Sequence, residues 1–428
     1  MKVLQGIIGQ AGQPYAISRG LRKIGIDSDC VLVQEHKFGY PSDIRLDIPR
    51  EPDIEGVHGN LQWCSERYDI AHFHARSFLS SPTLHEFPSG LDLLSLRLMG
   101  MKVIFHFRGS EVRSREQFAA ANPYNYAYGE AASRLFDKIS DDGKKAFIPF
   151  IQGVCNKVLV IDPELQGYVP GAVVVPRALN AEDWDFVGPV NAEVPTVVHA
   201  PSRRGVKGTD AILAAVNKLK AEGLRFDFQL VENMPNAEAR SLYTQADIII
   251  DQLRIGWHGV LAVEGMALGK TVITYIRDDL WHSCGTRPPV LNANPDTLSE
   301  VLREAIRNKE LRQRMGAEAR QYFEQTHSST SVANLLKTIY TDVLADPTPP
   351  DSLAVMRYLN RQFELAGSKE GISKAEDLKR TASAAHLAQT LDDLPRPVRL
   401  ALSAYLVYRT QGTRTMFRET IRYLRGQS

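Results

Sequence analysis

Cysteines and long apolar runs are both scarce in this sequence of 428 residues. The four cysteines, at positions 30, 64, 155 and 284, lie far apart and form no C-x-x-C pair, which argues against a zinc site or a disulfide framework. No stretch approaches the ~20 apolar residues that span a bilayer, and the first apolar run is too short for a signal peptide. The sequence therefore predicts a protein of the reducing cytoplasm.

Net charge is also small. There are 51 Lys and Arg against 50 Asp and Glu, giving a formal charge of +1, so no overall field attracts nucleic acid and no such partner is expected. There is no Ser-His-Asp or Cys-His pattern and no H-E-x-x-H zinc motif. A glycine fingerprint followed by an acid ~20 positions on is missing too, which disfavours a dinucleotide-dependent dehydrogenase.

Short apolar runs alternate with helical patterns over most of the chain. Strands are predicted at 1–8, 28–33, 68–73, 102–107, 157–161, 172–176, 196–200, 226–231, 248–250 and 271–275. Strands joined by crossover helices form parallel sheets covered on both faces. A polar, proline-bearing segment at 180–193 divides the pattern into two blocks, and a ligand is expected between them, outside the carboxyl ends of the strands.

We expect an α/β domain at 1–185, a second at 186–345 and a helical C-terminal extension at 346–428. The extension starts at the proline-rich DPTPPD and carries seven arginines and one acid after position 393, three of them repeating every fourth residue from Arg414. A basic amphipathic helix is typical of peripheral contact with an anionic membrane. The alternative is a helix packed on the body with solvated arginines.

The loop HAPSRRGVKGTD, which begins at His199 after a predicted strand, is rich in cations. Arg203, Arg204 and Lys207 precede a helix N-terminus, and two glycines let the backbone approach a ligand closely. Cations and free N–H groups at a helix start are what a diphosphate requires. The alternative is a solvated basic loop.

A second polar loop, 251–259, leads into a predicted helix from Val260 to Leu268 that ends at Gly269. Glu264 lies in this helix among apolar residues, and a buried carboxylate is costly unless it accepts hydrogen bonds. The two neighbouring hydroxyls of a ribose would supply them. The alternative is a structural hydrogen bond, or an ion pair with Lys270.

Together, HAPS at 199–202, the Lys207–Gly208 pair, the strand at 246–250, the glycine-containing loop and the helix EGMALGK resemble the donor half of retaining GT-B glycosyltransferases of the family-four, or group 1, type. The resemblance extends more weakly over residues 1–345. It implies two Rossmann-like domains whose parallel sheets face a central cleft, the first binding the acceptor and the second the nucleotide-sugar donor. It also implies transfer of a sugar to a glycan, lipid-linked or small-molecule acceptor with retention of anomeric configuration, as in polysaccharide biosynthesis.

The resemblance assigns roles to these residues. Arg203 and Lys207 would hold the diphosphate and compensate charge on the leaving nucleotide, with Arg204 beside them, and Glu264 would bind the ribose. The donor loop, whose backbone N–H groups would face the phosphate or sugar, comprises Gly256, Trp257, His258, Gly259 and Val260. No metal or cofactor is expected, because side-chain cations take that part and no Asp-x-Asp motif occupies a suitable loop.

One position departs from the family. The first carboxylate of its Glu-x7-Glu pair should stand eight residues before Glu264, where this chain has Gly256. In the family that carboxylate usually contacts the donor sugar, so sugar identity stays open. His258 or Asp251 would be its replacement.

The first block supplies a further set. The turn 9–14, which includes Gly12, would face the ligand, and FHFRGSEVR resembles the family's HGSD-R segment, with Arg108 in the place of its histidine. Arg108 and His106 would help place the sugar and phosphate, although a satisfied core histidine is the alternative for His106. Expected acceptor contacts are His74, Glu111 and Arg113, the last two of which would otherwise pair with each other.

Two other functions remain compatible with the sequence. One is a GT-B-fold sugar-nucleotide epimerase or hydrolase; the other is a non-catalytic protein that binds a sugar nucleotide or a glycan. The tyrosines of NPYNYAYGE at 122–130 would stack on sugar rings or else pack internally. No motif specifies the base, the sugar, the acceptor, the linkage or the oligomeric state.

Overall fold

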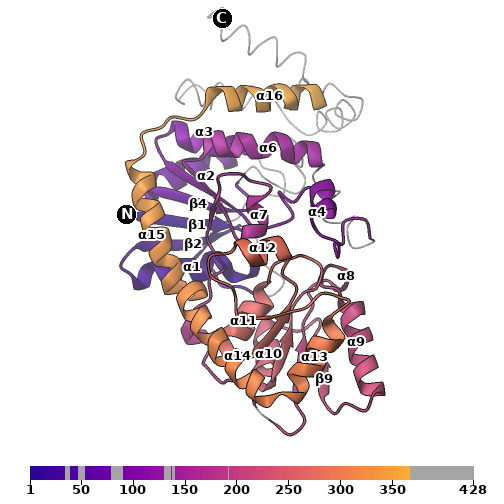
Figure 1. Cartoon of the computed structure of the whole chain (residues 1–428). Coiled ribbons are helices and arrows are strands. Elements are labelled where there is room, and N and C mark those ends of the chain that lie inside the picture. The colour runs from indigo at the N-terminus through magenta and orange to yellow at the C-terminus, as the bar shows by residue number, and fades with distance from the viewer. Residues whose placement is uncertain are drawn as a thin grey trace, which may run out of the picture.

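The computed structural model describes residues 1–33, 39–46, 54–78, 90–129, 136, 140–190 and 192–366. Two parallel β-sheets, each flanked by helices, lie one above the other in Figure 1. The arginine-rich segment after residue 393 falls outside the described residues, so its membrane contact stays a prediction. None of the described helices has the length and apolar character that crossing a bilayer requires.

The first sheet has seven strands in the order β3-β2-β1-β4-β5-β6-β7, and every neighbouring pair is parallel. Its strands are β1 (Lys2–Ile7), β2 (Asp27–Leu32), β3 (Ile44–Arg45), β4 (Ile70–His74), β5 (Lys102–Phe107), β6 (Lys157–Val160) and β7 (Val173–Val174). The order reverses between β1 and β4, which is where doubly wound sheets open a crevice at their carboxyl edge.

Helices cover both faces of this sheet. One face packs against α1 (Gln13–Lys23) and α15 (Ser329–Ala345), the other against α2 (Ile54–Arg67), α3 (Leu91–Leu98) and α6 (Asp141–Val154). Helix α16 (Ser352–Ala366) lies outside α6 (Figure 1), with the rings of Phe150 and Tyr358 stacked at 4.1 Å. Shorter helical elements are η1 (Gln10–Gly12), α4 (Arg115–Ala121), α7 (Pro163–Gln166) and η3 (Ala181–Asp183).

The second sheet repeats the plan with five parallel strands in the order β12-β11-β10-β8-β9. Its strands are β8 (Thr196–His199), β9 (Asp227–Leu230), β10 (Ile248–Ile250), β11 (Thr271–Thr274) and β12 (Leu291–Asn292). One face packs on α9 (Thr209–Ala221) and α13 (Leu298–Arg307), the other on α10 (Asn236–Gln245), α11 (Val260–Leu268) and α14 (Lys309–Tyr322). The remaining elements are α8 (Arg204–Lys207), α12 (Asp278–Ser283) and a π-helical turn, η4 (Phe323–His327).

The predicted α/β fold with two parallel sheets is confirmed, and each predicted strand ends within two residues of an observed one. Strands β3 and β12 were not predicted, because two half-buried residues carry no periodic signal. Helices α2, α3, α6, α10 and α15 were not predicted by residue range either.

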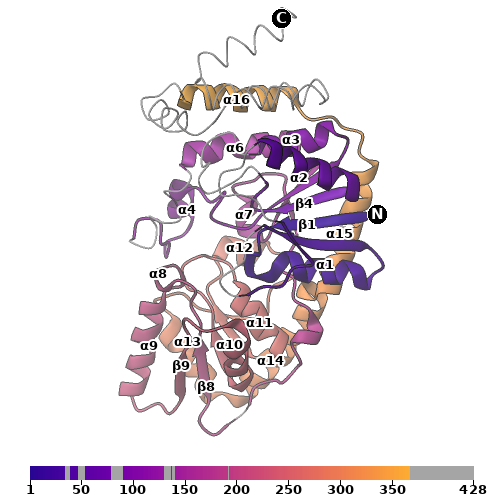
Figure 2. The same ribbon diagram turned by 180° about the vertical axis from the view of Figure 1, so that it is seen from behind.

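Helix α15 follows the second sheet in sequence yet packs on α1 beside the first sheet, as both views show (Figures 1 and 2). The contact is close at Gly20, where a Cβ atom would lie 2.2 Å from the carbonyl oxygen of Ser329. Just before α15, Ser328 forms an isolated parallel bridge with Leu179. The domain bounds expected at 185 and 345 stay predictions.

Replacing Gly20 by alanine therefore tests this packing. The alanine methyl would overlap backbone atoms, which costs about 1–3 kcal/mol, against a gain of about 1 kcal/mol in helix propensity. We expect a lower thermal midpoint. Gly59→Ala in α2 is the matched control, because no atom lies within 4 Å of its Cβ position; it should leave the midpoint unchanged or raise it. A Gly20→Ala variant as stable as the Gly59→Ala protein would contradict the packing.

Candidate functional site

The carboxyl ends of strands from both sheets meet at a cavity of about 310 Å³. Its wall comprises Ala11, Tyr40, Ala200, Pro201, Ser202, Lys207, Val231, Glu232, Asn233, Met234, Ala239, Tyr243, Val260, Leu261 and Glu264. We call it the Glu264 cavity. Ala11 and Asn233 have left-handed backbones, with φ of 48° and 55°; such conformations in non-glycine residues are uncommon and gather at functional sites.

Glu264 is 7 % exposed on α11, a helix that is apolar and buried on nearly every side. Tyr40 reaches the same cavity from the first domain, and a Cβ on Gly12 would lie 3.1 Å from Cδ1 of its ring. Burial, with the nearby Glu264 carboxylate, raises the pKa of Tyr40 to about 12. A carboxylate and a phenol that stays protonated thus face the same space from opposite domains.

Asp251 organises the loop ahead of α11. Its fully buried carboxylate accepts a hydrogen bond from Lys207 Nζ at 2.8 Å and another from the backbone N–H of Gly259, the N-cap of the helix. Lys207 Nζ also donates to Gln252 Oε1 at 2.5 Å. A Cβ on Gly259 would lie 2.8 Å from both Asp251 Oδ2 and Lys207 Nζ, so this network needs glycine there. The network fixes the Lys207 ammonium in the cavity wall.

The two arginines of the basic loop do not line the Glu264 cavity. Arg204 is exposed and pairs with Glu232, its Nε donating to Oε1 at 2.8 Å. Arg203 is exposed at the N-cap of α8, where its carbonyl oxygen accepts from the Lys207 N–H, and its side chain makes no hydrogen bond or ion pair with any described residue. Of the three cations predicted for the diphosphate, the structure places only Lys207 in the wall.

Gly256 has φ of 95°, and a Cβ there would lie 2.6 Å from Arg277 Cγ. Arg277 is buried and forms a two-point ion pair with Asp279. The side chain of Arg277 thus packs in the space that a family carboxylate at 256 would enter. Asp251 and His258 were the residues suggested to replace that carboxylate. Asp251 is hydrogen-bonded to Lys207 and Gly259, and His258 lines a different cavity.

Trp257 and His258 line a second cavity, of about 570 Å³, rather than the Glu264 cavity. Its wall comes from both domains and from α15, with Pro163, Pro176 and His327 among its residues. The rings of His258 and His327 meet edge to face at 5.2 Å. The donor loop therefore separates two cavities, with Val260 facing the Glu264 cavity.

The segment after β5 holds Arg108 in a partly buried setting. Its Nη2 donates to His74 Nδ1, and its backbone N–H, like that of Gly109, donates to Glu111 Oε1. Burial and the charge of Arg177 lower the pKa of Arg108 to about 9, so it remains a cation at neutral pH. Its Nε and Nη1 are buried and have no acceptor in the described structure. An uncompensated N–H of this kind is costly and points to an anionic partner.

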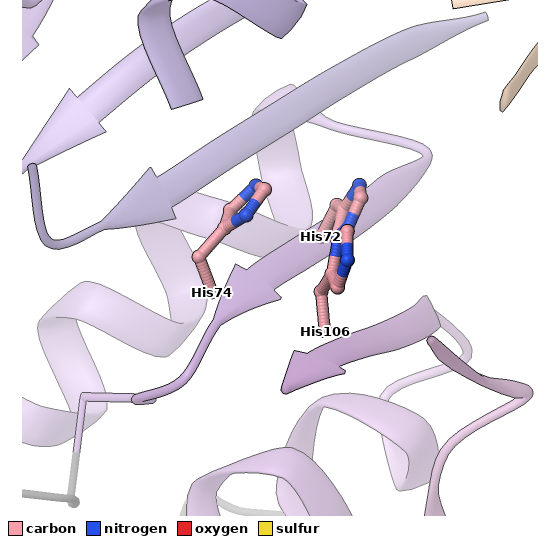
Figure 3. Close-up of side chains that lie close together, drawn as sticks. All are labelled: His72, His74 and His106. Carbon is pink, nitrogen blue, oxygen red and sulfur yellow. The ribbon is translucent and has the colours of Figure 1, made fainter. Parts of the chain in front are cut away.

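The expected acceptor residues are engaged within the protein. Arg113 forms a buried two-point ion pair with Glu164, at 3.0 Å from Nε and 2.6 Å from Nη2, and does not pair with Glu111. His74 and His106 are fully buried. Figure 3 shows them with His72 on the adjacent strands β4 and β5, where the three rings contact one another, and none of them is a wall residue of the Glu264 cavity.

The tyrosine-rich segment after α4 joins the two domains. Arg254 donates to the backbone oxygens of Tyr124 and Asn125 at 3.2 and 2.5 Å, and Asn122 Nδ2 donates to Arg254 O at 3.0 Å. Tyr124 packs edge to face on Tyr275 at 5.2 Å. Of the two expectations for these tyrosines, internal packing describes Tyr124.

No family model and no curated protein matches the sequence. Solved structures do match, and they define the fold as the GT-B glycosyltransferase architecture. A glycosyltransferase from Rickettsia africae is 16 % identical over 80 % of this chain and 98 % of its own, with a TM-score of 0.54. Sucrose-phosphate synthase from Thermosynechococcus elongatus is 15 % identical over 80 % of this chain and 98 % of its own, with a TM-score of 0.53. HepE from Anabaena, solved with UDP and glucose, is 11 % identical over 80 % of this chain and 100 % of its own, with a TM-score of 0.53.

Several wall residues carried no signal in the sequence. Tyr40 belongs to a loop that matches no motif. Asn233 comes shortly after strand β9 and Tyr243 lies on helix α10, and no sequence pattern marks either of them as a site residue. A local signal is Pro41, because the residue before a proline, here Tyr40, is held in an extended conformation. Arg277 was unpredictable for a different reason: its packing on Gly256 is decided by the fold.

Substitution of Gly256 tests whether the missing carboxylate can be restored. We expect Gly256→Glu to lower the thermal midpoint rather than create a sugar contact, since left-handed backbone costs about 1–2 kcal/mol and overlap with Arg277 adds about 1–3 kcal/mol. Gly256→Ala should show most of the same loss. In an Arg277→Ala background the overlap is removed, so the remaining loss of stability should be only that due to the left-handed backbone. A fully stable Gly256→Glu protein would refute the steric account.

Proposed function

We propose that this protein is a retaining, metal-independent glycosyltransferase that transfers a sugar from a nucleotide-sugar donor. The observation that carries the proposal is the Glu264 cavity: a buried carboxylate, a fixed ammonium and residues of both domains meet at the carboxyl edges of two parallel sheets. Ligands of such sheets bind at this edge. HepE, which shares the fold, was solved with UDP and with UDP-glucose, so uridine nucleotides are the first donors to test.

The chemistry follows from the charges of the wall. Glu264, whose carboxylate belongs to the cavity wall, would accept hydrogen bonds from the two ribose hydroxyls. Lys207 and the N-terminus of α11 would stabilise the diphosphate, whose negative charge grows as the glycosidic bond breaks. Arg108, which follows β5 at the carboxyl edge of the first sheet and is not a wall residue of the Glu264 cavity, would add a second cation. In this proposal the side-chain cations and the helix dipole take the part that a metal ion takes in other transferases.

The anomeric outcome is part of the proposal and follows from the family resemblance. A leaving diphosphate that accepts the acceptor's proton on the same face of the sugar gives retention. The acceptor, whether glycan, lipid-linked or small, would approach from the first domain, and a lipid-linked acceptor would suit a cytoplasmic enzyme at the inner membrane face.

The occupied space beside Gly256 favours a second candidate, a GT-B-fold protein that binds the sugar nucleotide without transferring its sugar. A hydrolase or epimerase would release nucleotide or isomerise the sugar with no acceptor present. A binding protein would do neither.

Donor recognition is tested by comparing UDP with 2′-deoxy-UDP in titration calorimetry. Since a hydrogen bond to a charged group contributes about 1.5–3 kcal/mol, the wild type should prefer UDP by about tenfold or more, and Glu264→Ala should bind both alike. Glu222→Ala, which alters an exposed carboxylate paired with Arg303, is the control and should keep the preference. If Glu264→Ala still discriminated, the carboxylate would not contact the ribose.

Transfer chemistry is tested by following slow hydrolysis of UDP-glucose by NMR in the presence of EDTA. Retention predicts α-glucose as the first product, before mutarotation. Lys207→Met should lower the rate by about 10²-fold, as loss of one preorganised donor to a developing anion typically does. Initial β-glucose would exclude retention, and a rate abolished by EDTA would exclude metal independence.

A further inference from the structure

Five hydrogen bonds connect Arg108 to the core of the first domain. Arg108 Nη2 contacts His74 Nδ1, His74 Nε2 lies 2.8 Å from Gln5 Oε1, and Gln5 Nε2 lies 2.7 Å from Tyr340 Oη. Tyr340 Oη then lies 2.7 Å from His72 Nδ1, and His72 Nε2 lies 3.3 Å from His106 Nδ1. Gln5, Tyr340 and the three histidines are fully buried. These hydrogen bonds form an unbroken chain from Arg108, at the end of β5, to Tyr340 of helix α15 and from there to His72 and His106.

The direction of every bond follows from Arg108, because a guanidinium can only donate. His74 Nδ1 must therefore present a lone pair, which places the proton of the neutral ring on Nε2 and makes that nitrogen the donor to Gln5 Oε1. Gln5 then donates through its amide nitrogen to Tyr340, whose hydroxyl proton is left for His72 Nδ1. His72 in turn donates from Nε2 to His106 Nδ1.

The opposite orientation of Gln5 is excluded by the same rule. With its amide nitrogen toward His74, that ring would carry its proton on Nδ1, and two donors would face each other at Arg108. Burial and the charge of Arg108 lower the pKa of all three histidines well below the usual value, so the rings are neutral. One arrangement of protons therefore satisfies all five hydrogen bonds; it places the His106 proton on Nε2, which is buried and has no acceptor among the described residues.

The three rings also lie close enough to suggest a metal site, with ligand atoms within 4.8 Å of one another. Their orientation argues against it. His72 stacks on His74 with planes 19° apart and on His106 with planes 15° apart (Figure 3), whereas ligands of one ion aim their lone pairs at a common point. Each Nδ1 lone pair already accepts a hydrogen bond, and the Arg108 cation touches His74.

We propose that Gln5, His72, His74 and Tyr340 are positioning residues, which fix one tautomer of His74 and thereby hold the Arg108 guanidinium in a single orientation for the donor diphosphate. The proposal rests on the proposed function, in which Arg108 is a phosphate-binding cation. Nη2 is held by His74, and Nε and Nη1 are left to donate to the anion. Tyr340 comes from α15, so the chain segment beyond the second sheet takes part in orienting a cation of the first domain.

The tautomers are measured directly, without any activity, in long-range proton–nitrogen NMR spectra of protein with ¹⁵N-labelled histidine. Single histidine variants assign the signals. We expect His72, His74 and His106 to be neutral at pH 7, each with its proton on Nε2, and equimolar Zn²⁺ to leave their shifts unchanged. A proton on Nδ1 of His74 would overturn the proposal. So would a Zn²⁺-induced shift of the three rings, which would show a metal site instead.

The positioning role is measured by a double-mutant cycle in the UDP-glucose assay. Tyr340→Phe and His74→Leu should each lower kcat by about tenfold with little change in KM, because a misplaced cation loses transition-state contacts first. His74→Asn, whose Oδ1 can accept from Arg108, should recover most of the rate. In an Arg108→Gln background neither Tyr340→Phe nor His74→Leu should lower kcat further.

If Tyr340→Phe or His74→Leu lowered kcat in the Arg108→Gln background as much as in the wild type, the role of these residues would be merely structural and the proposal would be overturned. Thermal midpoints of all variants separate this outcome from misfolding. If the wild type neither binds nor turns over a sugar nucleotide, the proposed function fails. The tautomer measurement still decides whether the chain orients Arg108.

Discussion

The close approach of α15 to α1 is the contact on which the rest of the arrangement depends. It requires a glycine at position 20, against which the backbone of Ser329 packs. Because α15 follows the second sheet in the chain, this contact holds the second domain against the first at a defined place. The bridge between Leu179 and Ser328 pairs the two crossing segments beside it. The cavities between the domains and the position of Tyr340 both depend on this packing of α15 against the first domain.

Buried charges are the second constraint, and most of them are matched. Asp251 is paired with Lys207 and a helix N-terminus, and Arg113 with Glu164. Removing one member of such a pair leaves an uncompensated ion, which is strongly destabilising. Arg108 differs, because two of its N–H groups have no acceptor among the described residues while a third is held by a neutral histidine. Arg108 follows β5 and therefore lies at the carboxyl edge of the first sheet, although it is not a wall residue of the Glu264 cavity.

The donor side of the site was predictable in part. Lys207 and Glu264 line one cavity as expected, since a cation after a strand and a carboxylate in an apolar helix are local signals. Trp257 and His258 belong to the same loop but line the other cavity. Neighbouring residues of a loop can face opposite ways, and only the backbone angles decide which. Tyr40 comes from a distant loop and was missed because its place depends on how the domains pack.

The amino-acid sequence by itself determined the two parallel sheets, all of their strands except β3 and β12, and the helix that carries Glu264, because apolar periodicity and glycine caps act over a few residues. The tertiary structure alone decided the partners of the polar groups. Arg277 beside Gly256, Glu164 beside Arg113, and Tyr340 hydrogen-bonded to Gln5 across 335 positions of sequence are contacts between segments far apart in the chain. A hydrogen bond or a steric overlap reaches only a few ångströms, so such pairs exist only once the fold has brought those segments together.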